Sequence, residues 1–232
     1  MVKEELIQRS PIRIFEQSIH GGLKSGEIGI VVSESGVGKT SVLVQLALDK
    51  LLQGKKVIHV SFTQHTHNVL AWYEDIFDEF ISKKNLEHAG DVKNELVKNR
   101  VLMNFNQDGV SGDQIIKSLR AMIVEGGFAA EAIIIDGLDF SRIDHERIAN
   151  VKAFAKELGL SIWYSCTIDK GQQCDREHLP LVLKDFAGLI DVVIALEPKS
   201  NHIALSVAKD RDSHDTKGLA MELDPKTLLI LS

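Results

Sequence analysis

The chain has 232 residues, of which 44% are hydrophobic and 26% are charged, as in an ordinary globular protein with one large α/β domain. Its formal net charge of -6 argues against a general binder of nucleic-acid backbones, which would be basic. Cys166 and Cys174 are too few for a disulfide scaffold. No signal peptide or run of 18 apolar residues is present, so we expect a cytoplasmic protein with no membrane partner.

Residues 1–13 lack strong periodicity and contain the breaker pair Ser10-Pro11, so we expect an arm that precedes one domain of residues 14–232. Short β-branched runs then alternate with helical patterns, which predicts a parallel sheet with crossover helices. The expected strands are 27–32, 56–62, 100–104, 132–135, 161–166 and 191–196. The expected helices are 40–52, 68–84, 113–125 and 145–158.

The C-terminal part of the sequence has a different pattern. Residues 202–208 alternate apolar and polar side chains, and 218–223 and 227–231 are short apolar runs. Alternation of this kind is typical of strands with one solvated face. We therefore expect a short antiparallel extension on an otherwise parallel sheet.

A phosphate-binding loop is predicted where the first strand runs into Ser33-Glu-Ser-Gly-Val-Gly-Lys-Thr40 and a helix follows at once. Glycines let backbone amides turn toward a phosphate, and the helix N-terminus favours an anion. In such a loop Lys39 reaches the β- and γ-phosphates, and the Thr40 hydroxyl binds Mg²⁺. The predicted nucleotide ligands are Ser35, Gly36, Val37, Gly38, Lys39, Thr40 and Ser41.

This loop departs from the full pattern at one position, where Ser33 replaces the first glycine. One alternative is therefore a scaffold that binds no nucleotide. Because the remaining amide-lined segment is intact, nucleotide binding is the favoured interpretation.

Asp136 ends the apolar run of residues 132–135. A carboxylate at the C-terminal end of a parallel strand faces the crevice where open α/β sheets bind ligands. We expect Asp136 to act with Thr40 in holding Mg²⁺, with Asp136 contacting a water molecule bound to the metal. Asp139 is a second candidate, but we expect it to cap the following segment instead.

The motifs together resemble those of the RecA-like ATPase superfamily, in its KaiC, RadA and DnaB branch. Residues 21–27, Gly-Gly-Leu-Lys-Ser-Gly-Glu, resemble the lead-in to the first core strand of that branch. The phosphate loop, residues 54–62 and the acidic strand 132–136 follow in the same order. The resemblance implies a RecA-like P-loop NTPase fold that binds ATP with Mg²⁺.

The resemblance also implies assembly into a homo-oligomeric ring or filament, or docking on a protein partner. Residues 205–211 resemble a strand end at which Lys209 and Arg211 would contact the γ-phosphate held by a neighbouring subunit. The alternative for this pair is a solvated surface role.

The catalytic glutamate of the resembled family has no counterpart after the second core strand, where Thr63 and Gln64 stand. Neither side chain can accept a proton near neutral pH, although Gln64 could position a water molecule. The enzymatic status is therefore open, and we expect a nucleotide-dependent switch with slow or absent hydrolysis. The alternative is an active, DNA-stimulated ATPase of recombinase or helicase type, although the charge balance of loop 169–178 does not favour DNA.

Overall fold

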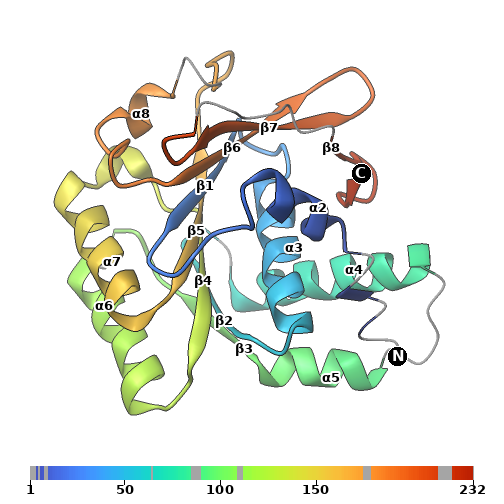
Figure 1. Cartoon of the computed structure of the whole chain (residues 1–232), viewed down its shortest axis with the longest axis horizontal. Helices are drawn as coiled ribbons and strands as arrows, with labels where there is room; N and C mark the ends of the chain where they lie inside the picture. The colour runs from blue at the N-terminus through green and yellow to red at the C-terminus, as the bar shows by residue number, and fades with distance from the viewer. Residues whose placement is uncertain are drawn as a thin grey trace.

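A nine-stranded sheet forms the centre of the described part of the chain, in the order β3-β2-β4-β5-β1-β6-β7-β8-β9 (Figure 1). The computed structural model describes residues 4, 6–7, 10–63, 65–84, 90–108, 112–174, 179–213 and 221–231. The strands are β1 (Ile28–Ser33), β2 (Lys56–Ser61), β3 (Arg100–Asn104), β4 (Ala130–Asp136), β5 (Ser161–Thr167), β6 (Val192–Pro198), β7 (Ile203–Asp210), β8 (Met221–Leu223) and β9 (Ile230–Leu231).

Strands β1 to β6 pair in parallel, and β7, β8 and β9 extend the sheet in antiparallel pairs. The prediction of an α/β fold with a mostly parallel sheet and an antiparallel C-terminal extension is therefore confirmed. Parallel pairing brings the C-terminal ends of β1, β4 and β5 to one edge of the sheet. Ser33, Asp136 and Thr167 lie at this edge.

Helices cover both faces of the sheet (Figure 1). One face packs against α2 (Pro11–Ser18), α3 (Lys39–Leu52), α4 (Thr66–Lys84) and α5 (Gly90–Lys98), and the other against α6 (Gly112–Arg120), α7 (His145–Leu158) and α8 (Leu181–Lys184). In β4, Ile134 packs toward the first layer, whereas Ile133 and Ile135 pack toward the second. Burial on both faces explains why this strand is apolar without alternation.

The N-terminal residues contribute more structure than their sequence pattern predicts. Pro11 is the first residue of α2, and the expected arm boundary at residue 13 falls inside this helix. Proline suits the first helical position because its missing N–H would have no partner there. Leu6 and Ile12 are buried in the core, so these residues pack on the domain.

Further elements differ from expectation. The single helix expected over 113–125 is α6, which ends at Arg120, followed by one π-helical turn over Ala121–Glu125. Helices α5 and α8 were not predicted, because each is short and has few buried apolar residues. Residues 218–220 of the expected strand 218–223 lie outside the described residues. The strand β8 begins at Met221. None of the described helices combines the length and hydropathy needed to cross a bilayer.

Candidate functional site

The predicted phosphate loop joins the C-terminal end of β1 to the N-terminus of α3. Gly36 and Gly38 both have left-handed backbones, with φ of 78° and 116°. A Cβ atom on Gly36 would meet no heavy atom within 4 Å, whereas one on Gly38 would lie 2.6 Å from Leu223 Cδ2. The backbone conformation therefore favours glycine at both positions, and packing requires it at Gly38. Val37, between them, is buried, so only its backbone is available to a ligand.

Lys39 folds back onto this loop. Its ammonium group donates to the carbonyl oxygens of Ser33 at 3.1 Å and Glu34 at 2.8 Å. Burial lowers the pKa of Lys39, and the negative charge of Asp136 opposes that shift. The cation is thus held among loop carbonyls, where an anion bound to the loop could replace them as its partner.

Thr40 and Asp136 meet directly at the sheet edge. The Thr40 hydroxyl donates to Asp136 Oδ2 at 2.8 Å, and the Ser165 hydroxyl donates to Asp136 Oδ1 at 2.6 Å. Ser165 Oγ also accepts the Gly137 N–H at 2.8 Å, which fixes the hydroxyl orientation. The predicted metal ligands are therefore adjacent, and their hydroxyl and carboxylate oxygens suit Mg²⁺. Sequence reasoning missed Ser165, because a serine inside an apolar strand carries no motif.

The position of the missing glutamate lies beside this pair. Thr63 follows β2 and packs against Gly137. A Cβ atom added to Gly137 would lie 2.6 Å from the Thr63 side chain. Gly137 itself follows Asp136 and has φ of 82°. The Thr63 side chain therefore lies against the residue that follows Asp136. Gln64, the predicted water-positioning residue, lies outside the described residues.

Ser41 is engaged by the C-terminal segment. Its hydroxyl donates to the carbonyl of Leu228 at 2.5 Å, and Gln45 Nε2 donates to the same oxygen at 2.9 Å. Gln45 Oε1 in turn accepts the N–H of Ile230 at 2.8 Å. Leu228 has a left-handed backbone with φ of 56°, which is uncommon for a side chain of this size. Ser41 is fully buried, and its hydroxyl is used within the chain.

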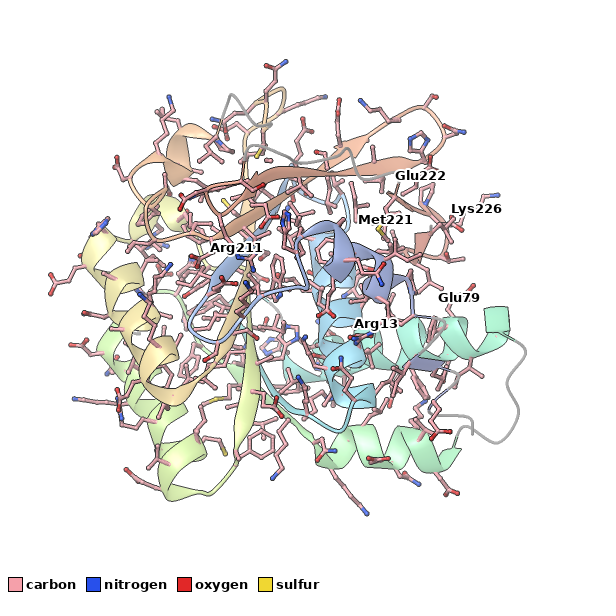
Figure 2. The ribbon with its side chains drawn as sticks, viewed as in Figure 1. Arg13, Glu79, Arg211, Met221, Glu222 and Lys226 are labelled. Atoms are coloured by element: carbon pink, nitrogen blue, oxygen red, sulfur yellow. The ribbon has the colours of Figure 1, made fainter. Side chains whose placement is uncertain are left out.

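Lys209 and Arg211 lie near the N-terminal ends of the parallel strands, whereas the phosphate loop lies at their C-terminal ends. Lys209 pairs with Val193 near the start of β6, and the Arg211 N–H donates to the carbonyl of Asp191. Figure 2 shows Arg211 well separated from Met221, which begins the strand that packs on Gly38. Both cations therefore lie away from the phosphate loop of their own chain.

Both cations also have partners within the chain. Lys209 Nζ donates to the carbonyls of Ala187 and Ile190. Arg211 pairs with the carboxylates of Glu27 and Asp210, and it also donates to backbone oxygens of residues 19 and 22. The side chain of Arg211 is 20% exposed and makes these contacts within the chain.

Two acidic side chains, Glu34 and Asp139, accept hydrogen bonds from backbone N–H groups. Glu34 Oε1 accepts the N–H of Gly171 at 2.8 Å, which links the phosphate loop to the segment after β5. Asp139 accepts the N–H of Ser141 at 3.0 Å, so it caps the short 3-10 helix that follows, as its position predicted.

His59 is a fully buried residue of strand β2. Its Nδ1 is 3.1 Å from the Tyr73 hydroxyl, and its Nε2 has no partner among the described residues. Complete burial lowers the pKa of His59 to about 4, with Asp136 opposing the shift and Arg100 adding to it. The ring is neutral at physiological pH and packs in the core. Among the described residues, no three histidine, cysteine, aspartate or glutamate side chains form a metal cluster.

The site thus combines a glycine loop at a helix N-terminus, a lysine beside it and a hydroxyl–carboxylate pair at the same sheet edge. In proteins, backbone amides and lysine are groups that bind phosphate oxygens, and hydroxyl and carboxylate oxygens are the ligands that hard cations prefer. A scan against protein-family models and a search of curated proteins both returned no match.

Proposed function

We propose that the protein binds ATP with Mg²⁺ at this loop, as a RecA-like domain, and acts as a nucleotide-dependent switch that hydrolyses ATP slowly or not at all. The observation that carries the proposal is the 2.8 Å contact of Thr40 with Asp136 beside a loop whose two glycines are left-handed. A phosphate ligand and its metal ion need these two features side by side.

The phosphate-binding part of the proposal rests on the start of α3. Backbone N–H groups at a helix N-terminus attract anions, and Gly36, where a Cβ atom would meet no heavy atom within 4 Å, leaves room for a close approach. Lys39 needs only to leave the carbonyls of Ser33 and Glu34 to meet phosphate oxygens. The choice of ATP over GTP follows the family resemblance.

The metal-binding part rests on the chemistry of two side chains. Thr40 supplies a hydroxyl oxygen and Asp136 a carboxylate, and Mg²⁺ prefers oxygen ligands. Ser165 holds the second oxygen of Asp136, so the carboxylate has one orientation. When bound, the metal would neutralise phosphate charge next to Lys39.

The expectation of weak hydrolysis rests on Thr63. A general base must lie within hydrogen-bonding reach of the attacking water and must be able to take its proton. The Thr63 hydroxyl cannot do so near neutral pH. We also propose that Lys209 and Arg211 act on nucleotide only in an oligomer, since they lie near the N-terminal ends of the parallel strands.

Calorimetric titration with ATP·Mg²⁺ and with a non-hydrolysable analogue tests the proposal, and a phosphate-release assay follows on the same sample. We expect saturable binding, negligible release and no detectable binding by Lys39→Ala. Lys199→Ala is the matched control, because Lys199 is a surface residue paired with Glu197. Unchanged affinity in Lys39→Ala would remove the central claim. Brisk release that single-stranded DNA stimulates would instead favour the motor function.

A further inference from the structure

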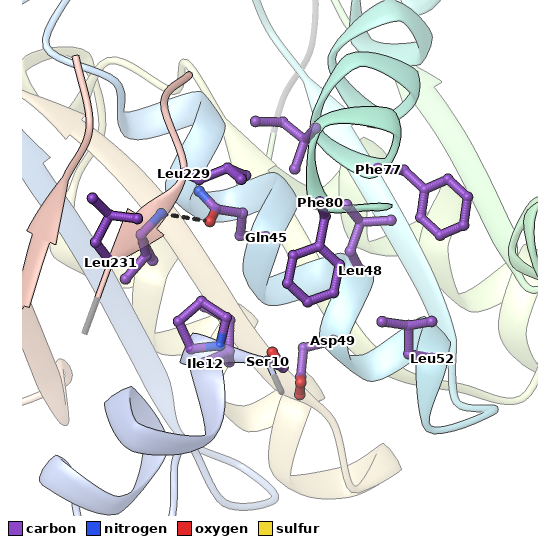
Figure 3. A pocket seen from close by; sticks show the side chains of 13 residues that line it. Ser10, Ile12, Gln45, Leu48, Asp49, Leu52, Phe77, Phe80, Leu229 and Leu231 are labelled. Carbon is purple, nitrogen blue, oxygen red and sulfur yellow. Dashed lines mark hydrogen bonds between the residues drawn. The ribbon is translucent and has the colours of Figure 1, made fainter. Parts of the chain in front are cut away.

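A cavity lies beside α3, away from the phosphate loop. It measures about 180 Å³, is partly open to solvent, and is lined by the start of α2, the later turns of α3, the middle of α4 and strand β9 (Figure 3). Most of its wall is apolar, and the side chains that matter here are Leu48, Leu52, Phe77, Phe80, Leu229 and Leu231.

The size of the cavity indicates what it can hold. An engineered apolar cavity of about 150 Å³ in another protein stays dry and binds benzene. The present cavity is somewhat larger, so it has room for one ring or a short branched chain. Its wall combines two aromatic rings with leucine side chains, and ligand pockets in proteins are lined mainly by such groups.

The polar side chains of the wall are already occupied. Gln45 donates to the carbonyls of Ser41 and Leu228, and its own oxygen accepts the N–H of Ile230. Asp49 is 1% exposed and accepts from Arg13 and Gln53. Since these groups have partners, a ligand gains little from hydrogen bonding there and gains chiefly from apolar contact.

The cavity shares two structural elements with the phosphate loop. Helix α3 begins at Lys39 and carries Leu48 and Leu52 on the cavity wall. The segment 228–231 lines the cavity with its side chains, while its first carbonyl accepts the Ser41 hydroxyl. Gln45 therefore links the cavity wall to the Leu228 carbonyl that Ser41 also contacts.

We propose that this cavity is a binding site for an uncharged apolar small molecule, of the size of one ring or a short branched chain. The site is separate from the phosphate loop, and its occupation shifts the Leu228–Ser41 contact. Because the ligand enters without nucleotide, the assignment stands or falls independently of ATP binding.

Titration of the full, isotope-labelled chain with benzene, without nucleotide, tests the assignment. Backbone amide resonances and the thermal unfolding midpoint are followed together. We expect saturable shifts at the amides of residues 229–231 and at Ser41, with a rise in the midpoint that grows with benzene concentration. Shifts that increase linearly without saturation, or that spare these residues, would overturn the proposal.

Cavity-filling variants make the test specific. Leu52→Phe fills the interior, and Leu231→Phe narrows the mouth, where the native side chain is 42% exposed and a larger one is tolerated by the fold. At least one of them should fold, lose the saturable shifts and leave the unfolding midpoint insensitive to benzene. Val124→Phe is the control, because Val124 is 55% exposed on a different element, and it should bind benzene as the native chain does.

A different occupant has a different signature. If sedimentation showed the chain to self-associate and Leu231→Phe to dissociate it, a side chain from a second copy would fill the cavity. That result would overturn the small-molecule assignment.

Discussion

The hydroxyl of Thr40 and the carboxylate of Asp136 are joined by a 2.8 Å hydrogen bond, although the residues are 96 positions apart. Their strands are not neighbours: β5 lies between β4, which carries Asp136, and β1, which leads to Thr40. The contact therefore crosses one strand at the sheet edge. Ser165 on that intervening strand contacts the same carboxylate, so three strands determine the geometry of one oxygen pair.

Replacing Ser165 with alanine should weaken metal binding. The variant removes the hydrogen bond that orients Asp136 Oδ1, and loss of such a supporting contact costs about 10- to 100-fold in metal affinity. The measurement is the Mg²⁺ concentration that gives half-maximal nucleotide affinity. Ser161→Ala is the control, because Ser161 lies on the same strand at its other end and bonds to Glu131. Equal Mg²⁺ dependence in both variants would mean that Ser165 does not support a metal ligand.

Thr63→Glu should raise the rate of ATP hydrolysis. The side chain at this position packs over Gly137, next to Asp136, and a carboxylate there could accept a proton from water. A positioned general base contributes about 10²–10⁴-fold, so we expect at least a tenfold rise in phosphate release. Thr66→Glu, at the exposed start of α4, adds the same charge farther along the chain and should change nothing. A native turnover of several per second would contradict the premise.

Gly38→Ala should destabilise the fold more than Gly36→Ala. Both variants place a Cβ atom on a left-handed backbone, which costs about 1–2 kcal/mol. Only at Gly38 would the new atom also overlap Leu223, and overpacking adds about 1–3 kcal/mol. Urea unfolding measures the difference.

A companion variant separates the two causes. In a Leu223→Ala background, Gly38→Ala should cost only the backbone part of the loss, because the overlapping atom is absent there. If Gly36→Ala and Gly38→Ala cost the same, C-terminal packing does not constrain the phosphate loop.

His59 should make the fold sensitive to acid. Its pKa is lowered from 6.5 to about 4 by burial, so the unfolded chain binds a proton more readily than the folded chain between those values. The free energy of unfolding should therefore fall as the pH drops from about 6.5 to 4, by about 3 kcal/mol in total. Above pH 6.5 the contribution is constant.

The slope can be assigned by substitution. His59→Gln keeps groups that can hydrogen-bond with Tyr73 but does not titrate, so its stability should lose this part of the pH dependence. His145→Gln, at the exposed start of α7, should keep the native slope. Identical slopes in both variants would place the acid sensitivity elsewhere.

Arg211→Ala should reduce stability even in a monomer. The guanidinium bonds to Glu27 and Asp210, and Asp210 is 1% exposed, so its removal leaves a buried carboxylate with fewer partners. We expect a loss of about 2–3 kcal/mol in the free energy of unfolding. Arg142→Ala, which breaks an exposed pair with Asp108, should cost less than about 1 kcal/mol. A neutral Arg211→Ala would show that its intramolecular contacts contribute no net stability.

The local parts of the site were predictable from the sequence. The segment from Ile28 to Thr40 carries its strand, turn and helix signals within 13 consecutive residues, and Asp136 ends a strand of its own. Such signals depend on neighbours in the chain, where spacing and propensity are informative.

Contacts between distant residues were not predictable in this way. Ser41 and Leu228 are 187 positions apart, and neither the hydrogen bond nor the left-handed backbone of Leu228 has a sequence signature. Ser165 appeared only as a polar residue in an apolar strand. Pro11 was interpreted as a helix breaker, although at the first helical position the same ring favours a helix.

The packing of Leu223 on Gly38 and the bond from Ser41 to Leu228 have a consequence for biosynthesis. The phosphate loop is translated before the residues that pack on it, since Leu228 lies 187 positions after Ser41. During translation the α3 side of the loop therefore stays incomplete until Leu223 and Leu228 have left the ribosome. A nascent chain stalled before that point would carry the glycine motif without the support that holds it in place.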